Sequence, residues 1–425
     1  MKLTKTQQEM LDGRQGEVMA KVVKTLVMYG EAFHAEKMVE VSSDYNHLVT
    51  SFGLGVLNPV YDLMNELIDA GVMSKQKFTA DPRPLDPNVP ANFIQNLIFR
   101  KFMYNRQEFY ENQLQKLGLL DQDGFTCTCY MHEVGNTPKM GDILSWSESS
   151  AVVYANSVLG ARCNRNSGIL DLMGSVAGFV PYFGLLTDEG RKAKWIVRIR
   201  TSKKPEAQLL GSAISMKVME DVPYVIGLDQ YLGDELNDAA CTYLKDFGAA
   251  CASNGAVGLY HIDNLTPEAK MYGKDLIRDD AEEYIIDDAE LERIYQSYPI
   301  IWKKKDAKPK LCFIGCPHMS LEQLKSWTIN VDQKLKEHHQ KQVTIPTVFT
   351  AAPGVIREFS QTEYRRILDE SGVVLSYICP LMYMNNPACA SMPVITSSNK
   401  LRTYTSARFY TEDEILDIIT KEASK

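Results

Sequence analysis

Three of the nine cysteines in this chain lie where a predicted β-strand gives way to a turn. Cys379 follows a short apolar run, Cys127 follows Phe125 and Thr126 in a short predicted strand, and Cys316 lies between an apolar run and a predicted helix. Ser320 and Gln323 have the spacing of a capping box, which predicts that a helix starts directly after Ser320. The positive end of that helix dipole would lie near Cys316 and should favour its thiolate, the form that attacks or binds metal. Because the carboxyl ends of parallel strands meet at one crevice, we expect the three thiols to converge.

Widely separated cysteines favour one kind of metal group over another. Mononuclear zinc sites usually include a closely spaced ligand pair, whereas this chain has no Cys-x-x-Cys pair. An iron–sulfur cluster between lobes suits scattered thiolates, and with three of them one iron stays open as a Lewis acid. We therefore predict elimination of water from a hydroxy acid. The basic residues available for its carboxylate are Arg162, Arg165, Lys400 and Arg402.

Two other roles for these cysteines remain open. Any one of them alone fits a buried structural cysteine equally well. Cys316 and His318 could also act as a nucleophile and its base within one tight turn, although the sequence identifies no third residue to orient the base.

Composition narrows the class of function. The chain has 425 residues, 45% hydrophobic and 24% charged, as in ordinary globular proteins, and its length predicts two or three lobes. A net charge of −8 argues against nucleic-acid binding, which needs a basic face. A cluster-bearing regulatory or RNA-binding protein is the alternative of a different class, and salt-sensitive RNA binding would identify it.

The chain ends and the cysteine count suggest a location. The first residues lack the apolar core of a signal peptide, and no apolar run is long enough to span a bilayer. We therefore expect a cytoplasmic protein without membrane contact. An odd number of cysteines without an export signal makes disulfides improbable.

The clearest alternation of strands and helices follows Pro309. A β-α-β-α-β order predicts parallel strands joined by right-handed crossovers. The predicted elements are strands at 311–314, 343–350 and 373–377 and helices at 321–336 and 353–370.

Earlier parts of the chain yield a coarser prediction. The run 92–117 is rich in Phe and Tyr with interleaved basic residues, and we expect a long amphipathic helix that buries its aromatics rather than a surface that stacks RNA bases. We expect a strand at 195–200, a helix at 234–251 and a charged surface connection at 279–306. The tentative lobes are 1–120, 121–305 and 306–425.

The chain also resembles a known family, aconitase X, the divergent branch of the aconitase superfamily, along nearly its whole length. The resemblance lies in motifs that occur in the family's order. They are Thr126–Tyr130, Trp146–Ala151, Asn156–Arg162, Leu244–Gly255, Leu259–His261 with Thr266–Glu268, Gly315–His318 and Cys379.

The resemblance implies a multi-lobe α/β fold with parallel sheets around a central cleft. It implies a cluster-dependent dehydratase, and the family's known members act on cis-3-hydroxy-L-proline or mevalonate 5-phosphate. Of these, cis-3-hydroxy-L-proline is the substrate we expect from sequence. The family also has a small component similar to the swivelling domain of aconitases. This chain has no obvious room for it, so we expect the large subunit of a heterodimer.

Roles for individual residues follow from the matched motifs. The resemblance implies cluster ligands at Cys127, Cys316 and Cys379. It implies substrate contacts at Ser149, Ser150, Arg162, Asn164 and Arg165. The catalytic candidates are Ser398, His318 and Lys400.

The chain departs from the family pattern at several motif positions. Cys129 replaces the proline of Cys-Thr-Pro-Tyr, and Cys163 and Asn166 replace the threonine and glutamate of Ala-Arg-Thr-Asn-Arg-Glu. The usual Thr-Asn-Ser-Gly-Lys appears as the run 396–400, Thr-Ser-Ser-Asn-Lys, and the acidic residue usual before the last cysteine is absent. We expect these changes to bear on substrate identity more than on cluster binding.

Overall fold

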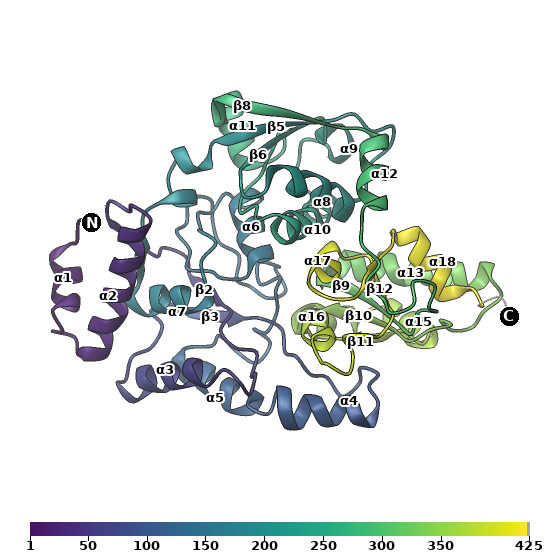
Figure 1. Ribbon diagram of the computed structural model, residues 1–425, viewed down its shortest axis with the longest axis horizontal. Helices are drawn as coiled ribbons and strands as arrows, with labels where there is room; N and C mark the ends of the chain where they lie inside the picture. The colour runs from purple at the N-terminus through teal and green to yellow at the C-terminus, as the bar shows by residue number, and fades with distance from the viewer. Residues whose placement is uncertain (423–425) are drawn as a thin grey trace.

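A computed structural model describes residues 1–422 as a mixed α/β structure with several parallel sheets (Figure 1). The sheet nearest the C-terminus has five strands, and all of its neighbouring pairs are parallel. Its order is β11 (Val374–Ser376), β10 (Thr347–Ala351), β9 (Leu311–Met319), β12 (Val394–Thr396) and β13 (Arg408–Phe409).

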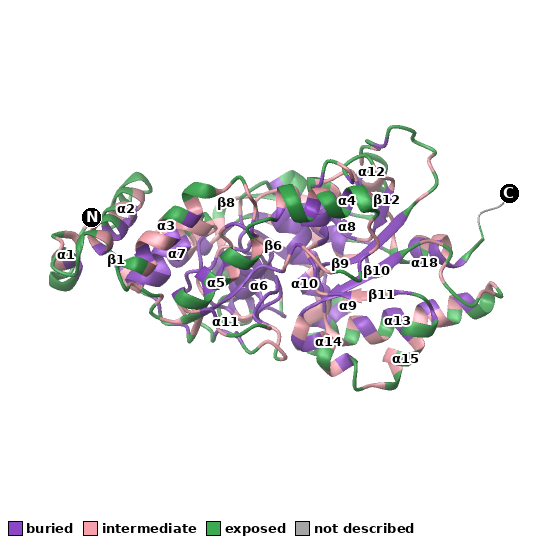
Figure 2. Cartoon of the chain, turned by 90° about the horizontal axis from the view of Figure 1, so that it is seen from below, coloured by how far each residue is buried: buried purple, intermediate pink, exposed green. Residues whose placement is uncertain are grey.

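Helices cover both faces of this sheet, so its central strands are buried (Figure 2). Along β9, Cys312 and Ile314 pack in one hydrophobic cluster, while Leu311 and Phe313 pack in the cluster on the other face, as the period of two in a strand requires. The helices are α13 (Leu321–Glu337), α14 (Pro353–Phe359), α15 (Glu363–Glu370), α16 (Pro380–Met384), α17 (Asn399–Tyr404) and α18 (Glu412–Thr420).

The predicted β-α-β-α-β order is confirmed, as is the capping box at the start of α13, where Ser320 and Gln323 each bond the other's backbone N–H. The strand predicted at 311–314 is too short. Phe349 of β10 pairs with Ile314, but Ala351, two residues later, pairs with Met319. Residues 315–318 therefore bulge out of the ladder. Cys316 therefore lies on a bulge inside β9 and not at a strand end.

Only glycine fits the first position of this bulge. Gly315 has a φ of +106°, and a Cβ atom there would lie 2.3 Å from the carbonyl oxygen of Thr350. The hydroxyl of Thr350 donates to the carbonyl of Gly315 at 2.6 Å, which fastens the bulge to β10.

A second parallel sheet lies in the middle of the chain, with strand order β7-β6-β5-β8. The charged segment after residue 279, predicted as a surface connection, instead supplies most of β8 and all of α12. The prediction failed because β8 is an edge strand with one exposed, charged face, and such a strand has no apolar run in its sequence. The elements are α6 (Ser149–Ser157), β5 (Ala193–Ile199), α8 (Ala207–Val218), β6 (Pro223–Ile226), α9 (Asp229–Leu232), α10 (Asp238–Asn254), β7 (His261–Ile262), α11 (Pro267–Tyr272), β8 (Ile277–Ile286) and α12 (Asp288–Gln296).

The N-terminal part packs helices around two short two-stranded sheets. The single helix predicted at 92–117 is wrong: a π-helical turn at Phe99–Met103 and a break before Gln107 divide it, and Phe93 and Phe102 are 81% and 67% exposed. The elements are α1 (Lys5–Leu11), α2 (Glu17–Ala32), β1 (Met38–Glu40), β2 (Tyr45–Leu48), α3 (Asn58–Asp69), β3 (Lys77–Ala80), α4 (Phe93–Ile98), α5 (Gln107–Leu117), α7 (Gly168–Ala177) and β4 (Phe179–Pro181).

Among residues 1–422, no helix is both long and apolar enough to cross a membrane. The division into three lobes stays a prediction.

A buried polar network fixes α6 relative to α11. Asn156 is fully buried, and its side chain accepts from the backbone N–H of Cys163 at 2.8 Å. The guanidinium of Arg191 donates to the backbone carbonyl of Asn156 at 3.0 Å and to both carboxylate oxygens of Glu268 at 2.8 and 3.0 Å. The network therefore positions the loop at 161–166, which carries Arg162 and Arg165.

We predict that Glu268→Ala lowers the free energy of unfolding by about 3–5 kcal/mol, because it leaves the buried guanidinium of Arg191 without its counter-charge. Urea unfolding followed by circular dichroism measures the loss. The matched control is Asp221→Ala, which breaks an exposed 2.7 Å pair with Lys194 and should cost about 0–1 kcal/mol. Equal losses in the two variants would contradict the prediction.

Candidate active site

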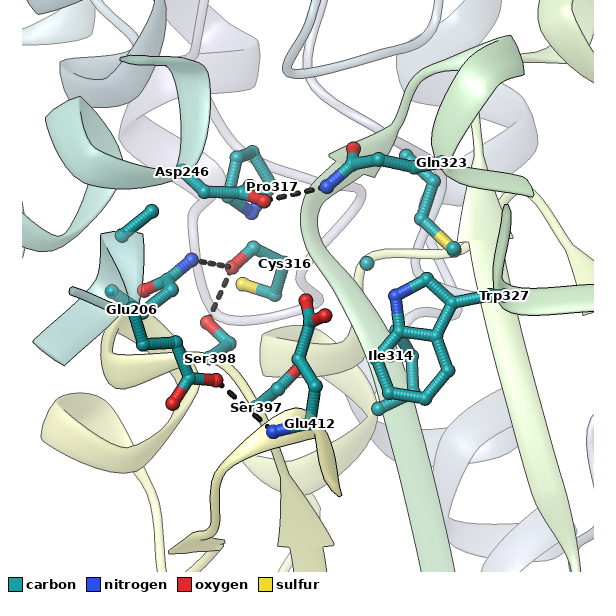
Figure 3. A pocket seen from close by; sticks show the side chains of 14 residues that line it. Glu206, Asp246, Ile314, Cys316, Pro317, Gln323, Trp327, Ser397, Ser398 and Glu412 are labelled. Atoms are coloured by element: carbon teal, nitrogen blue, oxygen red, sulfur yellow. Dashed lines mark hydrogen bonds between the residues drawn. The ribbon is translucent and has the colours of Figure 1, made fainter. Parts of the chain in front are cut away.

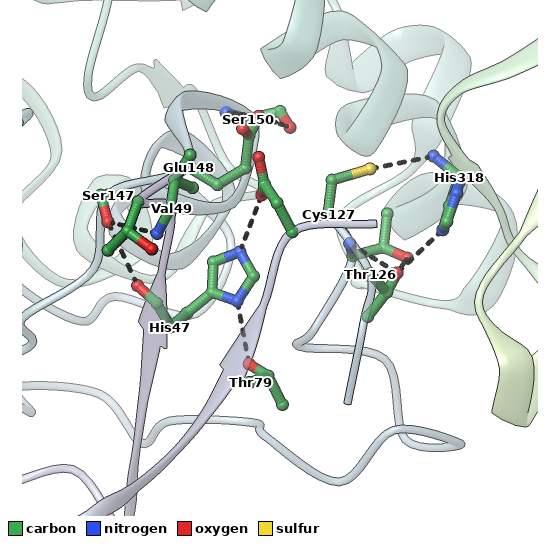
Figure 4. A network of polar contacts seen from close by, with 12 residues as sticks. His47, Val49, Thr79, Thr126, Cys127, Ser147, Glu148, Ser150 and His318 are labelled. Atoms are coloured by element: carbon green, nitrogen blue, oxygen red, sulfur yellow. Dashed lines mark hydrogen bonds and ion pairs between the residues drawn. The ribbon is translucent and has the colours of Figure 1, made fainter. Parts of the chain in front are cut away.

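The three segments that carry the predicted cysteine ligands meet at His318, whose side chain is fully buried. Figure 4 shows its contacts with Thr126 and Cys127. The backbone N–H of His318 donates to the sulfur of Cys127 at 3.4 Å. Its ring atom Nδ1 lies 3.0 Å from the hydroxyl of Thr126, and Nε2 lies 3.1 Å from the carbonyl oxygen of Ile378, the residue before Cys379. The convergence expected for these segments is thus present, although Cys127 follows an isolated bridge and not a strand.

The three thiols also share an electrostatic environment. Burial raises the pKa of Cys127, Cys316 and Cys379, and the ammonium of Lys400 opposes that rise at each of them. Cys316 lies near enough to both other cysteines that its thiolate, when formed, would raise their pKa further. The expectation that the environment of Cys316 favours the thiolate is wrong, because desolvation outweighs the favourable charge of Lys400.

The donor set fits a group bound by thiolates from separate segments. Among residues 1–422, no three His, Cys, Asp or Glu side chains are arranged to hold a single metal ion. A cluster distributes its thiolate ligands over different irons and therefore needs them farther apart than one metal ion does. Cys316 lies within electrostatic range of both Cys127 and Cys379, and Lys400 is near all three thiols, which meets this looser requirement.

Lys400 forms a buried ion pair with Glu148, a residue that the sequence analysis did not select. Ser150, the second residue of α6, donates to the same carboxylate oxygen from its hydroxyl at 2.7 Å and its N–H at 3.1 Å. Burial alone would raise the pKa of Glu148, but Lys400 and Ser150 outweigh it and lower the pKa. Ser149, at the start of α6, is partly exposed.

Ser398 is engaged by the protein on both sides (Figure 3). Its hydroxyl donates to the carbonyl of Cys316 and accepts from the N–H of Leu401 at 3.1 Å, which makes it the N-cap of α17. Cys316 and Ser398 line a cavity whose wall also includes the carboxylates of Glu206 and Asp246. A catalytic Ser398 would first have to release these bonds.

His318 is likewise fully engaged. Because both ring nitrogens have partners, the imidazole is not free to activate Cys316, and the alternative of a Cys316–His318 nucleophile pair finds no support in this geometry. Burial also lowers the pKa of His318 to about 4, so the ring is neutral.

The predicted substrate-binding residues of the loop after α6 fall into two groups. Arg162 pairs with Asp188 at 2.6 Å, and Asn164 bonds the backbone at Phe183 and Leu185 at 3.0 and 2.8 Å, so both brace neighbouring loops. Arg165 differs from these two. Its Nη2 reaches a backbone carbonyl, but its buried Nε has no hydrogen-bond partner among residues 1–422.

The structure adds a buried pair that the sequence analysis missed. Nε2 of His47 and Oδ1 of Asp81 lie 3.6 Å apart, and in the described part of the chain neither atom has a hydrogen-bond partner. Nδ1 of His47 is held by the hydroxyl of Thr79 at 2.9 Å, as Figure 4 shows. Asp81 follows β3 directly, so the strand-end argument applied to the cysteines could have selected it.

Asp81 belongs electrostatically to the same site. Burial and the carboxylate of Glu148 raise the pKa of Asp81 to about 6, although His47 and Lys400 oppose the rise. Asp81 is also a charged neighbour of Cys379. A carboxylate with this pKa can exchange a proton near neutral pH.

Comparison with known proteins places the chain in a family. Residues 1–189 match the family model described as aconitase X first domain, and residues 193–296 match the aconitase X second domain. A phosphomevalonate dehydratase large subunit from Thermococcus kodakarensis is 29% identical over 89% of this chain and 89% of the relative. One from Methanocaldococcus jannaschii is 30% identical over 76% of this chain and 77% of the relative.

Other matches agree with this assignment. A cis-3-hydroxy-L-proline dehydratase from Hypocrea jecorina is 30% identical over 67% of this chain, which spans 48% of that longer relative. The crystal structure of Thermococcus kodakaraensis aconitase X in its holo-form superposes with a TM-score of 0.80 and 26% identity, covering 99% of this chain and 100% of the other.

The family and fold expected from the motifs are therefore confirmed: the chain belongs to the aconitase X family and is an enzyme of the hydro-lyase class, a dehydratase.

Proposed function

We propose that this chain is the large subunit of a dehydratase whose substrate is mevalonate 5-phosphate. The observation that carries the proposal is the extent of the matches. The first five relatives are named phosphomevalonate dehydratase large subunits, and the chain covers between 75% and 92% of each. A small subunit on a separate chain is part of the proposal because those relatives are named as large subunits.

Two unpaired cations support a substrate with two anionic groups. Arg165 donates to the carbonyl of Ala252 and Arg402 to the side chain of Asn254, so both reach the last turn of α10. Within residues 1–422, neither guanidinium forms an ion pair with a carboxylate. Mevalonate 5-phosphate carries a carboxylate and a phosphate, and guanidinium forks suit both.

The second candidate substrate is cis-3-hydroxy-L-proline, the one expected from sequence. Its support is the similarity to the Hypocrea jecorina enzyme and to a second relative from Pseudomonas aeruginosa, which is 32% identical over 35% of this chain. The two substrates share their reaction, since in each a proton next to the carboxylate and a hydroxyl one carbon further are eliminated. They differ in charge, because the proline analogue carries one anionic group and an amine.

For the reaction itself we assign roles to residues around Lys400. Lys400 and Arg165 hold the substrate carboxylate, and Glu148 with Ser150 fixes the position of the ammonium group. Arg162 and Asn164 hold the loop in shape. Asp81 accepts the proton next to the carboxylate, and His47 balances its charge. A catalytic role for Ser398 and a substrate contact at Ser149 stay predictions.

Cys127, Cys316 and Cys379 would bind an iron–sulfur cluster. When bound, such a cluster supplies a Lewis acid that makes the substrate hydroxyl a better leaving group. The lysine beside all three thiols compensates part of their negative charge once they are deprotonated.

The first test concerns substrate charge. Arg165→Ala and Arg402→Ala should each raise KM for mevalonate 5-phosphate by about tenfold to a hundredfold, the cost of one charge-assisted contact, in assays that include the small subunit. Arg408→Ala is the control, because Arg408, like Arg402, lies over aromatic rings, but its hydrogen bond goes to the carbonyl of Lys305 and not to α10, and the KM of this variant should not change. Turnover of cis-3-hydroxy-L-proline without turnover of mevalonate 5-phosphate would reject the first candidate.

The second test concerns the cluster. Protein purified without oxygen should contain iron and sulfide and absorb visible light. Cys127→Ser, Cys316→Ser and Cys379→Ser should each remove most of the iron, whereas Cys251→Ser, a buried cysteine bonded to a backbone carbonyl in α8, should keep it. Full iron content in Cys316→Ser would remove that residue from the ligand set.

The third test concerns the base. Asp81→Asn should lower kcat by about 10²–10⁴ while iron content and KM change little, because the amide keeps the shape but cannot accept the proton. The exposed Asp62 of α3 is the control, and Asp62→Asn should retain wild-type kcat. A loss of less than threefold in Asp81→Asn would assign the base elsewhere.

A further inference from the structure

We propose that His318 is a positioning residue that holds the three cysteine-bearing segments in register, and that it acts through them rather than on the substrate. The segments are 125–129, 315–319 and 376–380. In the part of the chain that the structure describes, every hydrogen bond that joins any two of these segments involves His318.

The hydrogen bonds have a definite direction. A backbone carbonyl can only accept, so Nε2 of His318 carries the ring proton and donates to Ile378. Nδ1 is therefore the acceptor, and the hydroxyl of Thr126 donates to it. The oxygen of Thr126 in turn accepts from the N–H of Thr128 at 3.1 Å. The two ring contacts reach 192 and 60 residues along the chain, so they are purely tertiary.

An imidazole suits this position for a geometric reason. It offers one donor and one acceptor on opposite sides of a rigid ring, whereas a side-chain amide presents both on one terminal carbon and a carboxylate only accepts. The backbone N–H of the same residue adds the contact to Cys127, and Cys316 lies two residues earlier on the bulge. His318 thus contacts Cys127, lies two residues from Cys316 and bonds the residue before Cys379.

The ring has no atom left for substrate. Both nitrogens are occupied, and the side chain is fully buried between the two loops. His318 therefore differs from Asp81 and Arg165, each of which has one buried polar atom without a partner among residues 1–422. This separates a residue that shapes the cysteine site from residues that are free to react.

The test measures the cysteines directly. The full chain, treated with a chelator, is labelled with iodoacetamide under native conditions, and the rate at each cysteine is followed by peptide mass spectrometry. In His318→Ala we expect Cys127 and Cys379 to react at least tenfold faster than in wild type. Cys312, buried in β9 behind the bulge, should react at its wild-type rate.

His261→Ala is the matched control. His261 is also a buried histidine, and its Nε2 bonds the carbonyl of Arg191 at 2.8 Å, but it lies in β7 of the other sheet. It should lower the melting temperature without changing the rates at Cys127 and Cys379. Thr126→Val is a milder second variant, because it removes only the hydroxyl bonded to Nδ1, and we expect it to accelerate Cys127 in a chain that still folds.

Two results would overturn the proposal. One is labelling of Cys127 and Cys379 at wild-type rates in both His318→Ala and Thr126→Val. The other is faster labelling that includes Cys312 to the same extent, because His318 would then support the fold as a whole. The amount of iron bound per chain after reconstitution is a second measurement, and it should fall in His318→Ala and Thr126→Val. Only this measurement depends on the proposed cluster. If wild-type protein binds no iron, that result counts against the cluster, and the labelling rates still decide the role of His318.

Discussion

The ion pair between Lys400 and Glu148 is the interaction on which the site depends most. Its partners are 252 residues apart, and their side chains are only 12% and 11% exposed, so the pair joins α17 of the C-terminal sheet to the start of α6. A buried charge is tolerated only when it is paired and hydrogen-bonded. The hydroxyl of Ser150 also donates a hydrogen bond to the carboxylate of Glu148. The ammonium of Lys400 in turn lowers the pKa of the nearby thiols and so offsets part of the rise that burial causes. Removing either partner would leave the other charge stranded beside the cysteines.

The two parallel sheets and the loops between them position the residues of the site. The bulge in β9 moves Cys316 out of the ladder, and the glycine before it allows the close approach of Thr350. Asn156 and Arg191 fix the loop that carries Arg165, so an arginine whose Nε has no partner in the described chain is held by neighbours that are fully hydrogen-bonded. Rigid support around a few unpaired polar atoms is the arrangement expected of a preorganised site.

The departures from the family motifs lie mainly in supporting positions. Cys163 is fully buried and directs its thiol at backbone carbonyls, including that of Trp146 at 3.5 Å. Asn166 bonds the carboxylate of Asp171 at 3.2 Å, and Asn399 donates to the carbonyl of Gln208 at 2.8 Å. Cys129 is a neighbour of His47. These contacts shape the surroundings of the site, whereas Ser397, which is also altered, lines the cavity together with Cys316 and Ser398.

The sequence by itself determined the family, the class of reaction and the parallel sheet after Pro309. Each of these depends on a local pattern: a motif or a strand–helix alternation. Tertiary structure alone decided that a charged segment forms the edge strand β8, and that the aromatic run at 92–117 is interrupted and partly exposed. It also decided that, among the described residues, Arg165 and Arg402 have no carboxylate partner, and that Asp81 lies beside His47. The physical reason is that periodicity along a chain reports which face of an element is buried, whereas the partner of a polar atom depends on residues tens or hundreds of positions away.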